Sequence, residues 1–534
     1  MSEPSINHPL MGVVEGKRVG EGIQFLGIKY ASLSDRFAEA QLNEYNPGQG
    51  LDASSLGPFP ISPASALNME TGIIQQSLPE TKVPRMDGLE CLNLNISVPN
   101  LPGGSNSARQ LPVLVYLHGG AFLFGSNWYP HYSQEKFVEL AQRRGSAVIA
   151  VILNYRLGLP GLMTSHELRA AGYKANNTLR DQKVAFRWIK KYIHGFGGDP
   201  NSITAIGQSA GAISICYHLQ STEALFHQAA ILGGSNITMG PATLEAAETI
   251  YNNVKSSLKL GDLTPEDRIK SLLAASESDL LGQADFVAGF NLVADQDVIP
   301  ETITLSSLTK ESDRLLPGKA WCQRLLVVQG NLEASVAGFL FLAARQEGIA
   351  KAFCTFMKEN FENTAAVERL LGLYDLSPKT KDSDALIAIM EYFNDVSFYA
   401  PACLLASLWP KGYVGNFNEG NPWNGPNRGK ANHMLDTAFL FQQYNSRMAA
   451  PQRAVAEAYA TDIAAFVAGL DALPQFTDGE QLVAWGPSNE GAIHQVTSRA
   501  SKSSGRRPDF FDVVDDLGGL SALLSGYEKF LRGA

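Results

Sequence analysis

A serine between two glycines stands where an apolar run of the sequence ends. The pentapeptide Gly207-Gln208-Ser209-Ala210-Gly211 directly follows the run Ser202–Ile206. This order is typical of a strand that turns sharply into a helix and presents the serine hydroxyl at the turn. Because chance supplies roughly a third of such a match in a chain of this length, the rest of the sequence must decide whether Ser209 is a nucleophile.

Acyl transfer by a serine requires donors for the oxyanion, a base for the hydroxyl proton and an acid that orients the base. The sequence His118-Gly119-Gly120-Ala121-Phe122 follows the apolar run Val113–Leu117. Small residues after a strand leave backbone N–H groups able to point into a cavity. An ordinary glycine turn is the alternative interpretation of this segment.

The elements that must position these groups alternate between strand and helix patterns. Apolar runs at 111–117, 146–153, 227–232 and 324–328 predict strands, whereas 181–194 has the spacing of an amphipathic helix. Such alternation favours a mostly parallel sheet that helices cover on both faces. The polar and helical stretch at about 238–312 predicts an insertion packed over that sheet.

Several further motifs occur in an order that resembles one known family, over a span from near residue 12 to beyond residue 490. They are Phe25–Ala31, Glu90–Asn95, Asn154–Gly158, Leu179–Gln182 and Phe196–Pro200. With the serine pentapeptide, they resemble the type-B carboxylesterases, the cholinesterase-like and lipase-like branch of the α/β-hydrolases. The resemblance implies an α/β-hydrolase fold, with a mostly parallel central sheet flanked by helices and helical insertions over an active-site gorge. It also implies an intracellular member of fungal or microbial type.

The resemblance assigns the base and the acid. His433 begins a segment, His433–Phe441, that is similar to the catalytic-histidine segment of the family. Glu333 occupies the place of the acid, 124 residues after Ser209 and 100 before His433, in the order that the fold dictates. Its neighbours Leu332 and Ala334 depart from the family pattern, so a surface glutamate is the alternative. Asp436 is a rival acid, although on a helix it would lie beside His433.

By the same resemblance, the oxyanion hole consists of the backbone N–H groups of Gly120, Ala121 and Ala210. Gln208 stands where the family usually has glutamate, and a neutral amide adds no charge beside the histidine. We expect Gln208, Phe122 and Phe124 to contact the substrate. Two further aromatic sites, Phe286–Phe290 and Tyr399, are candidates for the pocket, although such residues more often pack in a core.

Composition limits the other classes of function. The net charge of −10 argues against nucleic acid or an anionic membrane as the main partner. The N-terminus lacks the pattern of a signal peptide, and no apolar run is long enough to span a bilayer. Five widely spaced cysteines predict reduced thiols, a cytoplasmic location and no metal site. The short basic run at 502–507 predicts a solvated loop.

We therefore expect one α/β-hydrolase domain over residues 1–534 that acts without a cofactor, as a monomer or homodimer, on a small-molecule ester. Secreted relatives close a flap with a disulfide at the position of Cys91, but no cysteine precedes Cys91 here. The segment at about 54–87 is therefore a candidate untethered flap loop. The predicted reaction is hydrolysis of a carboxylic ester through a Ser-His-Glu triad and an acyl-enzyme.

Two other functions stay open. An acyltransferase, or an enzyme that forms or opens lactones, would use the same triad. A non-catalytic, cholinesterase-like binding protein is a remote alternative, because such proteins typically lose the serine.

Overall fold

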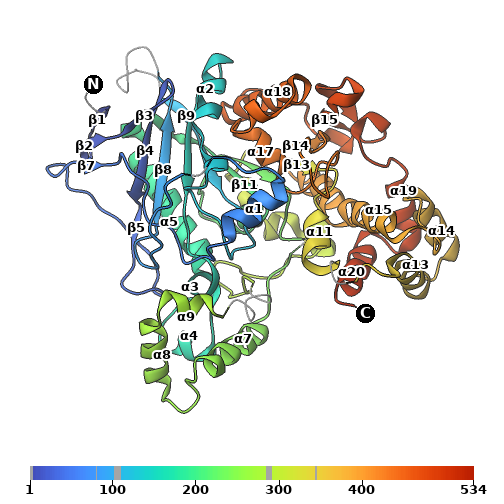
Figure 1. The fold of residues 1–534 in the computed structure, drawn as a ribbon, viewed down its shortest axis with the longest axis horizontal. Coiled ribbons are helices and arrows are strands. Elements are labelled where there is room, and N and C mark those ends of the chain that lie inside the picture. Colours follow the sequence, from blue (N-terminus) through green and yellow to red (C-terminus); the bar gives the residue numbers. More distant parts are fainter. Residues whose placement is uncertain are drawn as a thin grey trace.

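A mixed sheet of eleven strands runs through the described part of the chain (Figure 1). The computed structural model describes residues 4–79, 81–100, 110–237, 239–283, 291–342 and 345–533. In spatial order the strands are β16 (His494–Ser498), β15 (Gln481–Trp485), β14 (Lys411–Phe417), β13 (Arg324–Gly330), β12 (Gln228–Leu232), β11 (Gly198–Gln208), β9 (Leu111–Leu117), β10 (Ile149–Leu153), β8 (Asn93–Val98), β4 (Gly22–Lys29) and β3 (Lys17–Val19). All neighbours from β15 to β10 are parallel, and the pairs at both edges are antiparallel.

Residues of one strand alternate between two separate cores, one on each face of the sheet. Along β9, Val113, Val115 and Leu117 belong to the larger core, whereas Leu114 and Tyr116 belong to the other. This division follows from the period of two in a strand, whose successive side chains point to opposite faces. A parallel sheet buried on both faces explains why these strands are almost continuously apolar in sequence.

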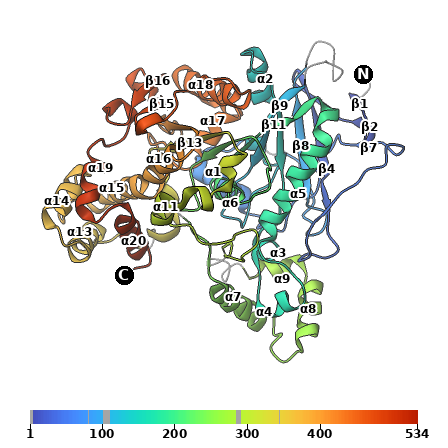
Figure 2. The same ribbon diagram turned by 180° about the vertical axis from the view of Figure 1, so that it is seen from behind.

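Helices cover both faces of the sheet. The larger core includes side chains of α5 (Asn177–Tyr192), α6 (Ala210–His218) and α16 (Ala400–Ser407), and Figure 2 shows α5 lying along the strands. The second core includes side chains of α2 (Glu135–Arg143), α17 (Leu435–Leu440) and α18 (Ala450–Val467). The arrangement is an α/β-hydrolase fold, as the sequence predicts.

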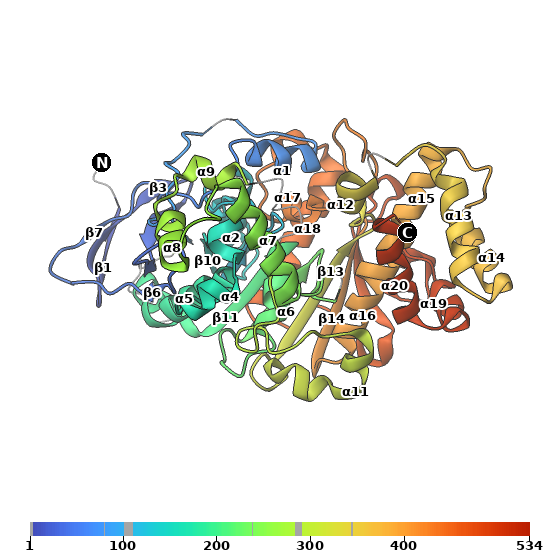
Figure 3. The same cartoon turned by 90° about the horizontal axis from the view of Figure 1, so that it is seen from below.

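The other helices gather at the periphery. Figure 3 shows α13, α14, α15, α19 and α20 at one end of the molecule, and Figure 1 shows α7, α8 and α9 projecting from the sheet. The remaining bounds are α1 (Ala66–Ile74), α3 (Gly158–Leu162), α4 (His166–Ala170), α7 (Leu244–Ser257), α8 (Pro265–Ala274), α9 (Glu277–Leu281), α11 (Leu305–Leu315), α12 (Ser335–Ala337), α13 (Ile349–Asn360), α14 (Thr364–Leu373), α15 (Asp382–Asn394), α19 (Phe510–Val514) and α20 (Leu520–Leu531). Small strands complete the N-terminal region: β1 (Ser5–His8), β2 (Gly12–Glu15), β5 (Ala31–Ser32), β6 (Gln41–Leu42) and β7 (Leu51–Asp52).

The predicted strands and helix are present with shifted ends. The run at 146–153 forms a strand only from Ile149, and the helix predicted at 181–194 begins at Asn177. Of the helices in the described residues, none combines the length and apolar character needed to cross a membrane. All five cysteines are buried free thiols.

Candidate active site

The backbone at Ser209 has the strained geometry of a sharp turn between β11 and α6. Ser209 has φ 54° and ψ −119°, a region that residues other than glycine rarely adopt and that is often found at functional sites. Its N–H donates to the carbonyl oxygen of Leu232, at 3.0 Å. A methyl group at Gly211 would overlap the carbonyl oxygen of Leu117 on β9. The half-buried side chain of Ser209 therefore stands at a turn that only small neighbours permit.

The loop after β9 has three consecutive residues with positive φ. The φ angles are 100° at Gly120, 52° at Ala121 and 62° at Phe122. The carbonyl oxygen of Gly120 accepts hydrogen bonds from the N–H groups of Leu123 and Phe124, which fold the loop back on itself. Among the described residues, no hydrogen-bond acceptor faces the N–H groups of Gly120, Ala121 or Ala210. These three groups are therefore available to a ligand.

His433 and Glu333 form a buried pair next to this turn. Nδ1 of His433 and Oε2 of Glu333 are 2.7 Å apart, and the two residues are 3% and 1% exposed. A carboxylate at this distance accepts a hydrogen bond from Nδ1–H, so Nε2 of the neutral imidazole carries the lone pair. Nε2 is therefore the atom of His433 that can accept a proton.

Backbone pairing holds the loop that carries Glu333 beside the loop that carries His433. The N–H of Leu332 donates to the carbonyl oxygen of Ala431, at 2.9 Å. The N–H of His433 in turn donates to Oγ of Ser335, at 3.1 Å. Because β13 and β14 are parallel neighbours, the chains that leave their carboxyl ends meet at the same edge of the sheet.

The carboxylate of Glu333 has a second anchor. Its Oε1 accepts a hydrogen bond from the N–H of Gly330, at 2.6 Å. The N–H of Glu333 donates to Oδ1 of Asn394, at 2.7 Å, and Arg506 donates to the carbonyl oxygen of Gly330, at 2.9 Å. These contacts fix the carboxylate against the histidine. Nothing in the sequence pointed to Asn394, and the prediction of a solvated loop is wrong for Arg506, which is 6% exposed.

Gln208 contacts the Nε2 side of the His433 ring. Its Nε2 lies 3.1 Å from Nε2 of His433, and the amide N–H is the donor when Nδ1 carries the imidazole proton. The Oε1 atom of Gln208 is buried and has no hydrogen-bond partner among the described residues. In this tautomer of His433, the lone pair of Nε2 thus accepts a hydrogen bond from the neutral amide of Gln208.

Within the described part of the chain, the carboxylate of Asp436 makes no hydrogen bond to the ring of His433. Its Oδ1 accepts from the N–H of Thr437, at 2.7 Å, and its other oxygen has no partner among the described residues. Burial, and then the nearby charge of Glu333, raise the pKa of Asp436 well above its usual value. A carboxyl group whose negative charge is disfavoured in this way is a poor partner for an imidazolium.

Known proteins resemble this chain along almost its full length. A family model described as the carboxylesterase family matches residues 2–502. The chain belongs to this family. It is 29% identical over 403 residues to para-nitrobenzyl esterase of Bacillus subtilis (strain 168), an alignment that covers 73% of each chain. It is 42% identical over 159 residues to phenmedipham hydrolase of Pseudarthrobacter oxydans, which is 29% of each chain.

Solved structures agree with the fold of this carboxylesterase. A structure of PNB esterase matches with a TM-score of 0.68 and 22% identity, and covers 94% of this chain and 99% of its own. A thermophilic PNB esterase matches with a TM-score of 0.70 and covers 95% and 100%. At this identity the likeness establishes the α/β-hydrolase fold, and the family establishes hydrolysis of carboxylic esters.

The aromatic residues predicted to line the pocket of the carboxylesterase have different surroundings. Phe122 is 0% exposed and packs in the larger core, and Tyr399 is 2% exposed. Burial of this degree favours packing over substrate contact for both. Phe124 is half-buried beside the second core and retains accessible surface. The segment Phe286–Phe290 lies outside the described residues.

The candidate flap of the carboxylesterase contains helix α1, and hydrogen bonds attach it to the rest of the molecule. Glu70 of α1 and His131 are both 0% exposed, with Oε2 and Nε2 2.8 Å apart. Nδ2 of Asn432 donates to the carbonyl oxygen of Ile73, at 2.8 Å. The segment at about 54–87 is therefore attached by non-covalent contacts, and Cys91 is a buried free thiol.

Proposed function

We propose that Ser209, His433 and Glu333 form the triad of a serine esterase that works through an acyl-enzyme. The observation that carries this proposal is the 2.7 Å contact between Glu333 and His433, which follow neighbouring parallel strands. The strained turn at Ser209 follows a third strand of the same sheet. This convergence supports a nucleophile, a base and an orienting acid at one site.

The reaction begins when Nε2 of His433 accepts the hydroxyl proton of Ser209 as Oγ attacks the ester carbonyl. The negative charge that develops on the carbonyl oxygen is stabilised by the N–H groups of Gly120, Ala121 and Ala210. The imidazolium then gives its proton to the departing alcohol, and the acyl group remains on Ser209. Water repeats the attack and releases the carboxylic acid.

Gln208 adds a step to this reaction. Since its amide N–H donates to Nε2 of His433 in the structure, that bond must give way before the hydroxyl of Ser209 can use the same lone pair. In this scheme Gln208 releases the base as the substrate enters, and half-buried Phe124 retains surface that can contact the substrate. Free thiols at all five cysteines support a reducing, intracellular compartment.

A series of chromogenic esters with increasing acyl length tests the triad and sizes the acyl pocket. We expect Ser209→Ala to lose at least about a thousandfold in kcat, and Ser214→Ala, a matched serine on α6, to retain activity. An organophosphonate should add covalently to Ser209, as read by mass spectrometry. Full turnover by Ser209→Ala would refute the proposal.

An acyltransferase on the same triad is the second candidate, because the alcohol or water that attacks the acyl-enzyme is not set by the triad. Added alcohols at increasing concentration distinguish the two. A hydrolase partitions toward free acid, whereas an acyltransferase gives ester even when the added alcohol is dilute. A binding protein without catalysis would show neither product.

A further inference from the structure

A cavity lies at the opposite end of the sheet from Ser209. It has a volume of about 870 Å³ and is bounded by Trp409 and Gly412, where β14 begins. The candidate active site lies beyond the other end of β14. A strand of seven residues spans about 20 Å, so the two sites are separated by roughly the depth of the sheet. The volume falls within the range of small-molecule pockets.

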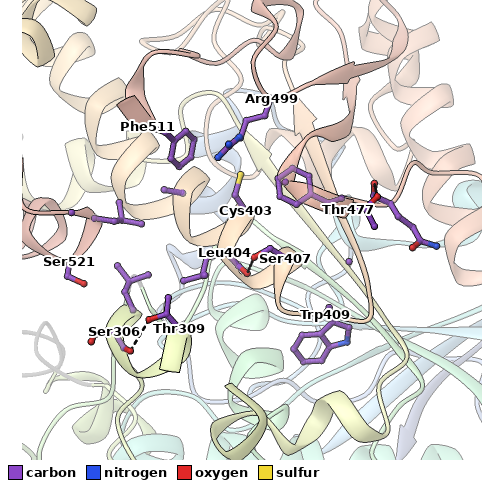
Figure 4. A pocket seen from close by; sticks show the side chains of 18 of the residues that line it. Ser306, Thr309, Cys403, Leu404, Ser407, Trp409, Thr477, Arg499, Phe511 and Ser521 are labelled. Carbon is purple, nitrogen blue, oxygen red and sulfur yellow. Dashed lines mark hydrogen bonds between the residues drawn. The ribbon is translucent and has the colours of Figure 1, made fainter. Parts of the chain in front are cut away.

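Apolar side chains make up the larger part of the lining of this cavity, which also includes hydroxyl groups such as those of Ser306, Thr309 and Thr477 (Figure 4). Cys403 and Leu404 of α16 face it from one side, and Leu305 of α11 and Phe476 face it from others. Burial raises the pKa of the Cys403 thiol to about 12, so the thiol is neutral and adds to the apolar surface. A ligand that fills this space must bring aliphatic or aromatic surface.

One positive charge stands at the rim. Arg499 is the only charged residue among the described residues that line the cavity, and its guanidinium stacks on the ring of Phe511, with 4.5 Å from Cζ to the ring centroid. In the described part of the chain no carboxylate pairs with Arg499, whereas nearby Arg507 pairs with both Glu391 and Asp395. Figure 4 shows the Arg499 side chain directed toward Cys403.

A half-buried guanidinium held by an aromatic ring presents its N–H donors in a planar fork. That fork matches the two oxygens of a carboxylate. The ring restricts the side chain in advance, so little conformational freedom is lost when an anion binds. A single cation beside an apolar floor fits a monoanion with an aliphatic tail better than a multiply charged ligand.

We propose that this cavity binds a free medium-chain or long-chain carboxylic acid. The carboxylate pairs with Arg499, and the aliphatic chain lies over Cys403 and Leu404 on α16. This site is distinct from the triad and does not depend on the role of Ser209. Free acids are also the products of ester hydrolysis, so the enzyme would hold at this cavity a molecule of the class that it releases.

Titration calorimetry with decanoate, below its aggregation threshold, tests the proposal. The titrations use the Ser209→Ala protein, with decanol and acetate as the uncharged and the tail-less ligands. We expect one decanoate site that weakens at least tenfold in Arg499→Met, by loss of a charge-assisted hydrogen bond pair, and less in Arg499→Lys. Decanol and acetate should bind that site at least tenfold more weakly than decanoate.

Two further variants separate the cavity from general effects. Leu404→Trp fills the floor while leaving Arg499 in place, and should abolish the decanoate site. Arg143→Met removes an arginine whose side chain is 61% exposed on α2, and should leave binding unchanged. Thermal melts verify that each variant is folded. Decanoate binding that is equal in the Ser209→Ala protein with and without Arg499→Met or Leu404→Trp, or that decanol or acetate matches, would overturn the proposal.

Discussion

Replacement of Gln208 by glutamate tests the contact between the Gln208 amide and His433, the proposed base. In the structure Nε2 of Gln208 lies 3.1 Å from Nε2 of His433. Glutamate has the same shape but brings a negative charge to that position. A carboxylate there favours the protonated imidazolium, so a higher pH is needed to generate the neutral base. We therefore expect the acid limb of kcat/KM to move to higher pH in Gln208→Glu.

The distance sets the size of the effect. Two unit charges 3.1 Å apart attract by about 5 kcal/mol at an effective dielectric constant of about 20. Gln208 is 0% exposed, and desolvation of a new carboxylate at such a position costs several kcal/mol. The net stabilisation of the imidazolium is then about 1–2 kcal/mol, which moves the acid limb of kcat/KM by about one pH unit. Activity on the acid side should then fall about tenfold, while the plateau at higher pH changes little.

The assay is a pH profile of kcat/KM with a neutral chromogenic ester, for wild type and Gln208→Glu. Gln220→Glu is the matched control, because Gln220 is also buried but follows the far end of α6. That control should leave the acid limb in place. A limb that does not move in folded Gln208→Glu, or that moves equally in Gln220→Glu, would refute the reasoning.

Two further substitutions test the packing around the site. Gly211→Ala places a methyl group against the carbonyl oxygen of Leu117, and the displaced turn should lower kcat by about a hundredfold, whereas Gly72→Ala, with open space around it on α1, should keep full activity in the same ester assay. Glu70→Ala leaves buried His131 without its partner, and urea denaturation should show a loss of about 3 kcal/mol in the free energy of unfolding, with Glu70→Gln losing less.

The sequence predicts the central parallel strands well, because their apolar runs reflect burial on both faces. It predicts β14 and the edges of the sheet poorly. The stretch 415–429 is rich in glycine, asparagine and proline and resembles a loop, yet its first three residues complete β14. Gly415 fits there because the ring of Trp485 fills the space that a side chain would occupy. Tertiary packing thus overrides local propensity at this strand.

At the candidate site, the sequence predicts the residues that belong to motifs and misses the residues that support them. Ser209, Glu333 and His433 each lie in a recognisable sequence motif. The structure places Glu333 against His433. Asn394 supports Glu333 from a helix 61 residues further along the chain, so no local pattern can reveal it. Arg506 is a similar case, because only the fold brings it to the end of β13.

Helix α1 and His433 share a structural neighbour in Asn432. Its Nδ2 donates to the carbonyl oxygen of Ile73 at the end of α1, and its Oδ1 accepts from Asn421, which also holds Ile74. Asn432 directly precedes His433. An isolated bridge between Leu332 and Asn432 joins it to the loop that carries Glu333. Displacement of α1 must therefore break hydrogen bonds of Asn432, which directly precedes His433. The position of α1 and the alignment of His433 with Glu333 are consequently coupled.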